Sequence, residues 1–521
     1  MKQAPEKKSA PKQREQKAGG RPAAPSRGAE GSPISWKNLF AIDLRSLALF
    51  RVSMAILLLV DLVVRVTDLN AMYTDDGMFS RAEICNRATT IWNWSFHFAS
   101  GSAGYQEMLF GLAGVLALAL LVGFETRLAT VGSWLMLVSV QHRVPAILSG
   151  AEILHHILLF WAMFLPLGSV WSVDHWLERR RATATPSDER PVLSIASAAI
   201  LLQMGLMYLF SAIFKSNAQW LHGEVLAGVL QHDFYASPIS AQLVAFPRLL
   251  RLATWATFAF EWAAPVLLFF PKGNARLRLG TIAALAAMHA GIGIFLDVGL
   301  FSFVALAGLT LFLPAEFWNS RLFARFSASE EGKVAVRTPV VQKRSRVAYA
   351  AQCVCLLFFI YVLAINVNGL PGHPLAPLTP ERWKPMTTAF GLGQRWGMFE
   401  AVPSMDGWYI ARARLADGSE IDLLREGAPV DWNRPKFPTR GYPNYFWRKL
   451  FREMAYDDEQ GFQVLREPVA QFLCRRWNAG KPAEKQISNF DLIYCMLNKA
   501  TNASPPQIAR GQLLHLDFDE P

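Results

Sequence analysis

The sequence predicts an α-helical polytopic membrane bundle of about nine spans, followed by a small α+β domain outside the cytoplasm. Three observations favour this fold class. Apolar residues make up 52% of the 521 residues and charged residues only 18%, whereas soluble domains carry about a quarter charged residues. The mean hydropathy is +0.20, and the apolar residues gather in stretches long enough to cross a bilayer. The charged residues gather between those stretches.

Residues 1–35 form the first predicted unit, a disordered basic arm. This segment is rich in Lys, Arg, Pro, Gly and Ala and has no apolar periodicity, which is typical of chain that cannot bury a core. It does not resemble a cleavable signal peptide. The net charge of +11 is explained by basic loops and by attraction to anionic lipid, so no nucleic-acid partner is expected.

Residues 36–366 form the predicted membrane domain. The apolar stretches that we interpret as spans lie at 47–66, 106–124, 128–147, 153–171, 192–214, 252–271, 279–296, 299–315 and 347–366. Each is close to the length of about 20 residues that a membrane helix needs. The stretches at 279–296 and 299–315 are the least distinct, because almost no loop separates them.

The charges of the loops predict the orientation. With nine spans and a cytoplasmic N-terminus, the strongly basic loops, which contain Arg127, Arg179–Arg181, Lys272–Arg278 and residues 321–346, all lie on the cytoplasmic side. This distribution follows the positive-inside rule. The C-terminal residues 367–521 then lie outside the cytoplasm, and Lys215 lies at the outer end of its span.

Residues 367–521 are predicted to fold as a small α+β domain. A β-hairpin is expected at 408–424, because both arms alternate apolar and polar residues around the two-residue turn Asp417-Gly418. Helical spacing follows at 445–454 and 462–477, and residues 489–497 are expected to add a strand.

The five cysteines do not form a disulfide framework. Cys474 and Cys495 fall on the outer side, where an oxidising compartment permits a single bridge, and the sequence leaves that bridge open. The chain has no Cys-x-x-Cys motif and no His/Cys cluster at metal-ligand spacing, so no metal site is predicted.

Polar residues within apolar spans are candidates for function, because lipid does not solvate them. Lys215 ends the apolar run 192–214, so it is either an anchor at the membrane interface or a base in a dry pocket. Glu261 is either a hydrogen-bonded core carboxyl or a proton relay. His289 is either a satisfied core histidine or a pocket residue.

Two further groups lie in the spans. Asp61 and Arg65 are four residues apart and predict an ion pair that locks neighbouring helices. Glu152 and His155 share a helical face, so they form either an acid/base pair or part of a helix cap.

Several blocks together resemble the vitamin K-dependent gamma-carboxylases. The run Tyr208–Trp220 is similar to the helix end that carries their catalytic lysine, and Lys215 occupies that place. Trp171-Ser-Val-Asp174 matches a motif that closes an earlier span, and Glu261 and the stretch from His289 to Pro314 follow the same family. Gln394–Phe399 and the hairpin resemble the bacterial relatives known as HTTM (horizontally transferred transmembrane domain) proteins.

The resemblance implies a lysine base that deprotonates a reduced quinone, in a carboxylation reaction that uses oxygen and carbon dioxide. Lys215 would be the base, and His289 and Glu261 would line its pocket. The second working histidine of the family aligns with Ala151, so His155, one helical turn later, would assist from the same face.

The sequence leaves two functions open for this membrane protein, which the resemblance places in a bacterial inner membrane. One is an enzyme with Lys215 as base on a quinone or similar lipid-soluble substrate. The other is a non-catalytic partner in the maturation, export or immunity of a secreted peptide, which the outer domain would bind. A transporter is less favoured, because the sequence has no inverted repeat of broken helices.

Overall fold

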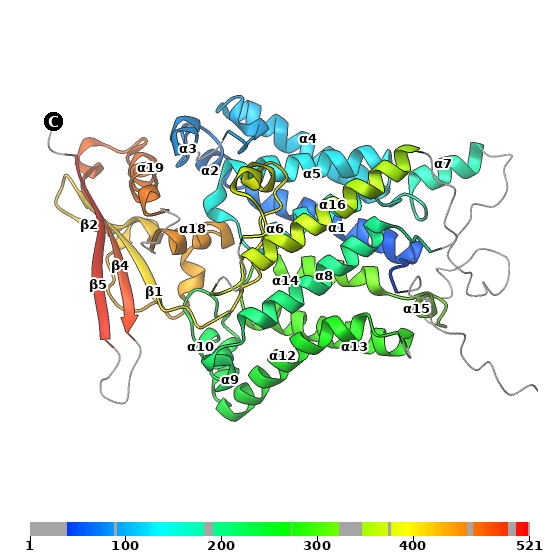
Figure 1. Cartoon of the computed structure of the whole chain (residues 1–521). Helices are drawn as coiled ribbons and strands as arrows, with labels where there is room; N and C mark the ends of the chain where they lie inside the picture. The colour runs from blue at the N-terminus through cyan, green and yellow to red at the C-terminus, as the bar shows by residue number, and fades with distance from the viewer. Residues whose placement is uncertain are drawn as a thin grey trace, which may run out of the picture. The chain divides into compact units, whose positions relative to one another are not determined.

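Long helices and a small antiparallel sheet make up the computed structural model of the chain (Figure 1). The structure describes residues 39–87, 91–181, 191–271, 274–321, 323, 346–372, 377–455, 462–498 and 507–518. The predicted basic arm at 1–35 lies outside the described residues. Trp36–Pro521 belong to one compact unit, so the sheet and the helices form a common core.

Each stretch that the sequence predicts as a span contains a helix. Within the described residues these helices are α1 (Leu44–Val66), α4 (Ala103–Val122), α5 (Thr126–Arg143), α6 (Gly150–Ala162), α8 (Ile195–Phe214), α12 (Pro247–Leu268), α13 (Asn274–Phe295), α14 (Phe301–Leu309) and α16 (Arg346–Asn368). By length and composition, α1, α4, α8, α13 and α16 are able to cross a membrane. Membrane crossing by all nine remains a prediction.

Two of the predicted spans are shorter than expected. Helix α6 has 13 residues and is therefore only about 20 Å long, less than the hydrocarbon thickness of about 30 Å. Helix α14 has 9 residues and continues into a single 3₁₀ turn. Most residues of both helices are buried, although Phe303 of α14 is exposed, and the two helices pack against each other.

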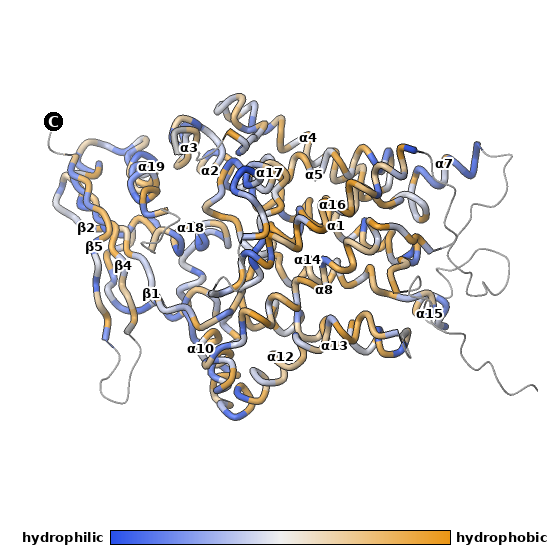
Figure 2. Tube along the Cα trace, viewed as in Figure 1, coloured by the Kyte–Doolittle hydropathy of each residue, from blue (hydrophilic) through white to orange (hydrophobic). Residues whose placement is uncertain are grey.

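Helix α8 lies at the centre of the bundle. In its most apolar stretch of 18 residues, 72% are buried, compared with 28% in the corresponding stretches of α4 and α16 and 22% in that of α13. It packs against α6, α12 and α16, whereas α4 exposes large apolar side chains such as Met108 and Val115. Apolar residues dominate the long helices, and the short α7 (Val173–Arg181) is hydrophilic (Figure 2).

The remaining helices are short and connect or cover the long ones. They are α2 (Leu69–Met72), α3 (Arg81–Arg87), α9 (Ala218–Leu221), α10 (Val225–Val229), α11 (Ser240–Val244), α15 (Ala315–Trp318) and α17 (Lys384–Ala389).

The predicted ion pair of the first span is confirmed and links the bundle to the C-terminal region. Arg65 Nε donates to Asp61 Oδ2 at 2.7 Å, and neither side chain is more than 4% exposed. Arg65 Nη1 donates to the hydroxyl of Tyr73 at 2.9 Å. The guanidinium group also lies 4.3 Å from the ring centroid of Phe446, on α18 (Tyr445–Ala455).

The C-terminal region contains a five-stranded antiparallel sheet in the order β3-β2-β1-β4-β5. Its strands are β1 (Gly407–Leu415), β2 (Glu420–Asp422), β3 (Ala428–Pro429), β4 (Ile487–Asn498) and β5 (Gln507–Asp517), and its helices are α18 and α19 (Arg466–Asn478). The hairpin of β1 and β2 is confirmed, and Gly418 supplies its turn with a φ of +84°. Both helices and β4 were predicted, whereas β3 and β5 were not.

The disulfide that the sequence left open is not formed. Cys474 and Cys495 are both buried and both free. Cys474, on α19, packs into the main core, whereas Cys495, on β4, packs with Trp408 and Ile410 in a separate cluster. Successive residues of a strand point to opposite faces, and Tyr494 next to Cys495 belongs to the main core. Cys495 therefore points away from α19.

Replacing Asp61 by Ala is expected to lower the free energy of unfolding by about 3 kcal/mol, because it leaves Arg65 buried without its closest carboxylate. Equilibrium unfolding in mixed micelles measures this change. Glu381→Gln is the control, since Glu381 and its partner Lys384 are 82% and 73% exposed, and a change of no more than about 0.5 kcal/mol is expected. Equal effects of the two variants would contradict a stabilising role of the buried pair.

Candidate functional site

Lys215 caps the C-terminal end of α8 and points into the protein. Its Nζ donates to both carboxylate oxygens of Glu261, at 2.6 and 2.7 Å, and to Ser211 Oγ at 2.7 Å. The side chains of Lys215 and Glu261 are 6% and 7% exposed. The ammonium group is therefore enclosed, and it does not lie free among lipid headgroups.

The turn after α8 places an indole beside this ammonium group. Asn217 Oδ1 accepts hydrogen bonds from the backbone N–H groups of Gln219 and Trp220, so Asn217 starts α9 within two residues of Lys215. The ring centroid of Trp220 lies 5.2 Å from Lys215 Nζ, and Trp220 is buried. The short helix thus closes one side of the site.

Residues 394–402, which we call the strap, cover the site from the C-terminal region. Trp220 Nε1 donates to the Phe399 carbonyl at 2.9 Å, and Asn217 Nδ2 donates to the Glu400 carbonyl at 2.7 Å. The backbone N–H of Val402 donates to Gln219 Oε1 at 2.9 Å. Three hydrogen bonds therefore fasten the strap to the turn that carries Trp220.

The other end of the strap is held by a buried amide. Gln394 Oε1 accepts hydrogen bonds from Gln203 Nε2 of α8 at 2.7 Å and from Trp396 Nε1 at 2.8 Å. Phe399 has a φ of +55°, a backbone conformation that residues other than glycine adopt at a cost of about 1–3 kcal/mol. The strap is thus fixed at both ends and strained where it passes Lys215.

His289 lies on α13 beside the ion pair. Its Nε2 is hydrogen-bonded to the hydroxyl of Tyr208 on α8 at 2.9 Å. Among the described residues, its Nδ1 has no hydrogen-bond partner although the atom is buried. One ring nitrogen is therefore available to a ligand.

Lys215, Glu261 and His289, from α8, α12 and α13, meet at one small cavity of about 30 Å³. Its other lining residues are mostly sulfur-containing, aromatic or aliphatic: Met207, Tyr208, Ser211, Met288, Ile292, Phe301, Trp396, Met398 and Phe399. The sequence predicted that the lysine, the glutamate and the histidine share a pocket.

A larger cavity of about 500 Å³ adjoins this one and was not predicted. The two cavities share Phe301, Trp396, Met398 and Phe399 as lining residues. Helix α18 lines the far side with Tyr445, Lys449, Arg452 and Glu453. The sequence contains one signal for this cavity, the block Gln394–Phe399. No local pattern in that block reveals that it lies over Lys215.

A family model for the HTTM domain matches residues 40–318. The chain belongs to the HTTM family. The matched region contains Lys215, Glu261 and His289 but ends before the strap and the sheet. The protein is thus an integral membrane protein of a class related to the gamma-carboxylases. No solved structure matches the chain.

His155 of this HTTM protein does not line the lysine cavity. It is buried on α6 and faces α1, where its ring lies near the backbone of Met54 and near Asp61. Glu152 caps α6 by accepting from the backbone N–H and the hydroxyl of Ser149, at 2.7 and 2.6 Å. Of the two roles that the sequence left open for Glu152, the structure shows the helix cap.

The Trp171–Asp174 motif of the HTTM region holds a turn together. Asp174 accepts hydrogen bonds from the backbone N–H groups of Glu125 and Thr126, both at 2.8 Å. The buried guanidinium group of Arg51 donates to the carbonyls of Leu167 and Trp171. The motif thus fixes the start of α5 to α1.

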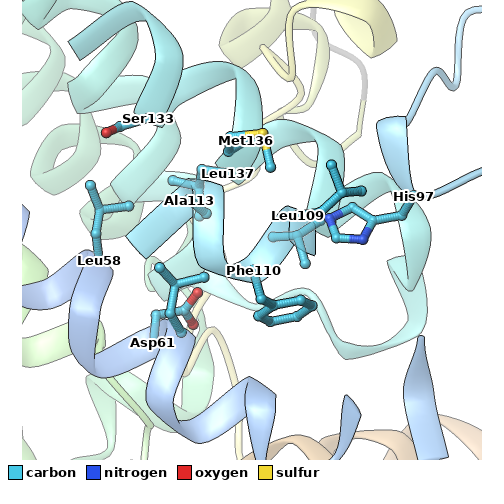
Figure 3. A pocket seen from close by; sticks show the side chains of 11 residues that line it. Leu58, Asp61, His97, Leu109, Phe110, Ala113, Ser133, Met136 and Leu137 are labelled. Atoms are coloured by element: carbon cyan, nitrogen blue, oxygen red, sulfur yellow. The ribbon is translucent and has the colours of Figure 1, made fainter. Parts of the chain in front are cut away.

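A third hollow, of about 20 Å³, lies among α1, α4 and α5 (Figure 3). Its lining is almost entirely apolar, with His97, Ser133 and Asp61 as the polar residues, and Asp61 is bound by Arg65. In the described part of the HTTM protein, no group of three His, Cys, Asp or Glu side chains is placed to hold a metal ion. Of these three cavities, the one beside Lys215 combines a lysine, a glutamate and a histidine.

Loosening the strap is expected to expose Lys215 to acylating reagents. The double variant Gln219→Ala/Trp220→Phe removes two hydrogen bonds to the strap, worth about 1 kcal/mol each, so Lys215 should be acetylated at least about tenfold faster. Peptide mass spectrometry after acetic anhydride treatment measures the rate.

The matched control is Trp477→Phe/Gln486→Ala, which also removes two hydrogen bonds between side chains and the main chain, but far from the strap. It should leave the rate at Lys215 unchanged. An equally fast rate in the native protein would show that the strap does not shield the amine.

Proposed function

We propose that this HTTM protein is a membrane-embedded enzyme in which Lys215 is the base that acts on a lipid-soluble, quinone-type substrate. The observation that carries the proposal is the enclosed contact between Lys215 Nζ and the Glu261 carboxylate. A base of this kind needs a cover that excludes water. Trp220 and the strap supply that cover.

Glu261 gives the lysine a route to its neutral form. A proton that moves from Nζ to Oε1 crosses a hydrogen bond of 2.6 Å and leaves an amine beside a carboxylic acid. In a medium of low dielectric constant the neutral pair avoids the cost of burying two charges. Lys215 Nζ can then accept a proton from a substrate hydroxyl, and Glu261 holds the proton that Lys215 gave up.

His289 is the candidate for orienting the substrate. Its Nε2 is engaged by Tyr208 at 2.9 Å, which fixes the plane of the ring, and its Nδ1 is buried without a partner among the described residues. The ring of Phe301 lies 5.7 Å away. We assign no role in this pocket to His155, because it faces α1.

The residues present fit a reduced quinone chemically. His289 Nδ1 is a polar atom for one of its hydroxyl groups and Lys215 is the base for the other, and the methionine and aromatic side chains suit a ring. When bound, a reduced quinone supplies an acidic hydroxyl group and reducing electrons. The cavity of about 30 Å³ holds little more than a water molecule, so Met398 and Phe399 must move toward the larger cavity to admit a ring.

We place the protein in a bacterial inner membrane with nine spans. The N-terminus is cytoplasmic and residues 367–521 lie outside, because the basic loops then share the cytoplasmic side. Within that arrangement the lysine cavity lies near the outer surface, under the C-terminal region. Lipid-soluble substrates would arrive between helices, and water-soluble ones from the outer side.

A second candidate function is a non-catalytic partner for a secreted peptide. The observation that favours it is the completeness of the ion pair, since Glu261 binds Lys215 through both oxygens as a clamp between α8 and α12 would. In that case the lysine only holds helices together, and the C-terminal region binds the client.

Replacing Lys215 by Arg separates these functions, because arginine keeps the charge but does not serve as a base. We expect the oxidation of a short-chain reduced naphthoquinone by molecular oxygen, catalysed by the protein in nanodiscs, to fall at least about a hundredfold. Glu261→Gln should have a similar effect. Bound quinone, measured by mass spectrometry of extracted lipids, should remain.

Lys384→Arg, at an exposed ion pair, is the matched control and should keep the native rate. If Lys215→Arg retains the rate, or the cellular phenotype of the native gene, Lys215 is a clamp and the catalytic proposal fails.

A further inference from the structure

The 500 Å³ cavity lies between α18, the strap and the N-terminal end of α6. Its volume is in the range of about 300–1,000 Å³ that is usual for sites of small organic ligands. One wall is apolar and is formed by Phe301, Trp396, Met398 and Phe399, and the opposite wall carries the charged residues of α18. The cavity is thus amphipathic.

The charged groups on its lining do not balance. Three cations, Arg395, Lys449 and Arg452, face two carboxylates, Glu400 and Glu453, which leaves one positive charge in excess. Arg395 pairs with Glu400 at 2.7 Å, so the excess lies at α18. Such an excess favours a ligand with one negative charge.

Lys449 makes fewer hydrogen bonds than Arg452, the other cation of α18 on this lining. Arg452 donates to Glu453 Oε1 through Nε and Nη2 and to the hydroxyl of Tyr235 through Nη1. Lys449 Nζ carries three donors and also donates to Glu453 Oε1, at 2.5 Å. The Lys449 side chain is only 11% exposed, so its remaining donors point into a confined space.

We propose that this cavity binds an amphipathic organic monoanion, with its apolar body against Phe301, Trp396 and Phe399 and its anionic end on Lys449. The proposal goes beyond the proposed function, because binding here does not require Lys215 to act as a base. It also places the ligand next to the lysine cavity, since the two cavities share one wall.

The charge state of Lys449 sets the pH range of binding. Burial, together with the positive charge of Arg452, lowers the pKa of Lys449 to about 8, although the carboxylates of Glu453 and Glu152 oppose the shift. The ammonium form, which predominates below pH 8, holds an anion, and the neutral amine above that pH does not. Affinity for an anion should therefore fall as the pH rises through 8.

The test uses naphthalene-2-carboxylate as the probe, with the full chain in nanodiscs and calorimetric titration at pH 7. Lys449→Gln should weaken binding at least about tenfold, because it removes a charge-assisted hydrogen bond. Glu453 keeps Arg452 as its partner in this variant, so the fold is expected to survive. Lys449→Arg should restore binding in part.

Two controls make the result specific. The neutral naphthalene-2-carboxamide should bind at least about tenfold more weakly than the carboxylate. Lys485→Gln, at a half-exposed lysine whose partner Asp417 lies outside the cavity, should bind the carboxylate as the native protein does. In the native protein the carboxylate should slow acetylation of Lys449 by acetic anhydride.

Equal affinities of the carboxylate and the amide, full binding by Lys449→Gln, or unprotected acetylation of Lys449 would each overturn the proposal. Lys215→Arg distinguishes it from the proposed function. Binding of the carboxylate by this variant would show that the cavity does not need Lys215. If the native protein then does not oxidise the quinone, the proposed function fails and the proposal for the cavity stands.

Discussion

The ion pair of Lys215 and Glu261 is the interaction on which the site depends. An ammonium group in an apolar bundle has no water to solvate it, so a carboxylate from a neighbouring helix must lie within hydrogen-bond distance. That requirement fixes α12 against α8. The fixed pair in turn positions the turn at Asn217, the indole of Trp220 and, through them, the strap.

The same requirement explains how much of the site was predictable. A lysine, a glutamate and a histidine in three spans must turn inward, and Lys215, Glu261 and His289 do meet. Helix ends were less predictable, because apolar composition does not mark where a helix stops, and α6 and α14 are shorter than the apolar stretches that contain them. The strap was not predictable, since its position depends on partners about 180 residues earlier in the chain.

His155 shows a second limit of sequence reasoning. Spacing places residues i and i+4 on one helical face, but it does not say which neighbour that face meets. In the structure the neighbour is α1, whose Asp61 and Arg65 form a separate buried network that reaches α18 through Phe446. The two polar networks therefore converge on the C-terminal region from different sides of α6 and α8.

The strap lies outside the region that the family model matches, although it covers the lysine within that region. Lys215 and the segment that covers it are thus encoded in separate stretches of the chain. A change between residues 394 and 402 would alter which molecules can enter the cavity beside Lys215. It would leave the amine of Lys215 and the carboxylate of Glu261 untouched. In the proposed enzyme, a change of substrate would therefore need substitutions only in the nine residues of the strap, and the helices that hold the charged pair would stay as they are.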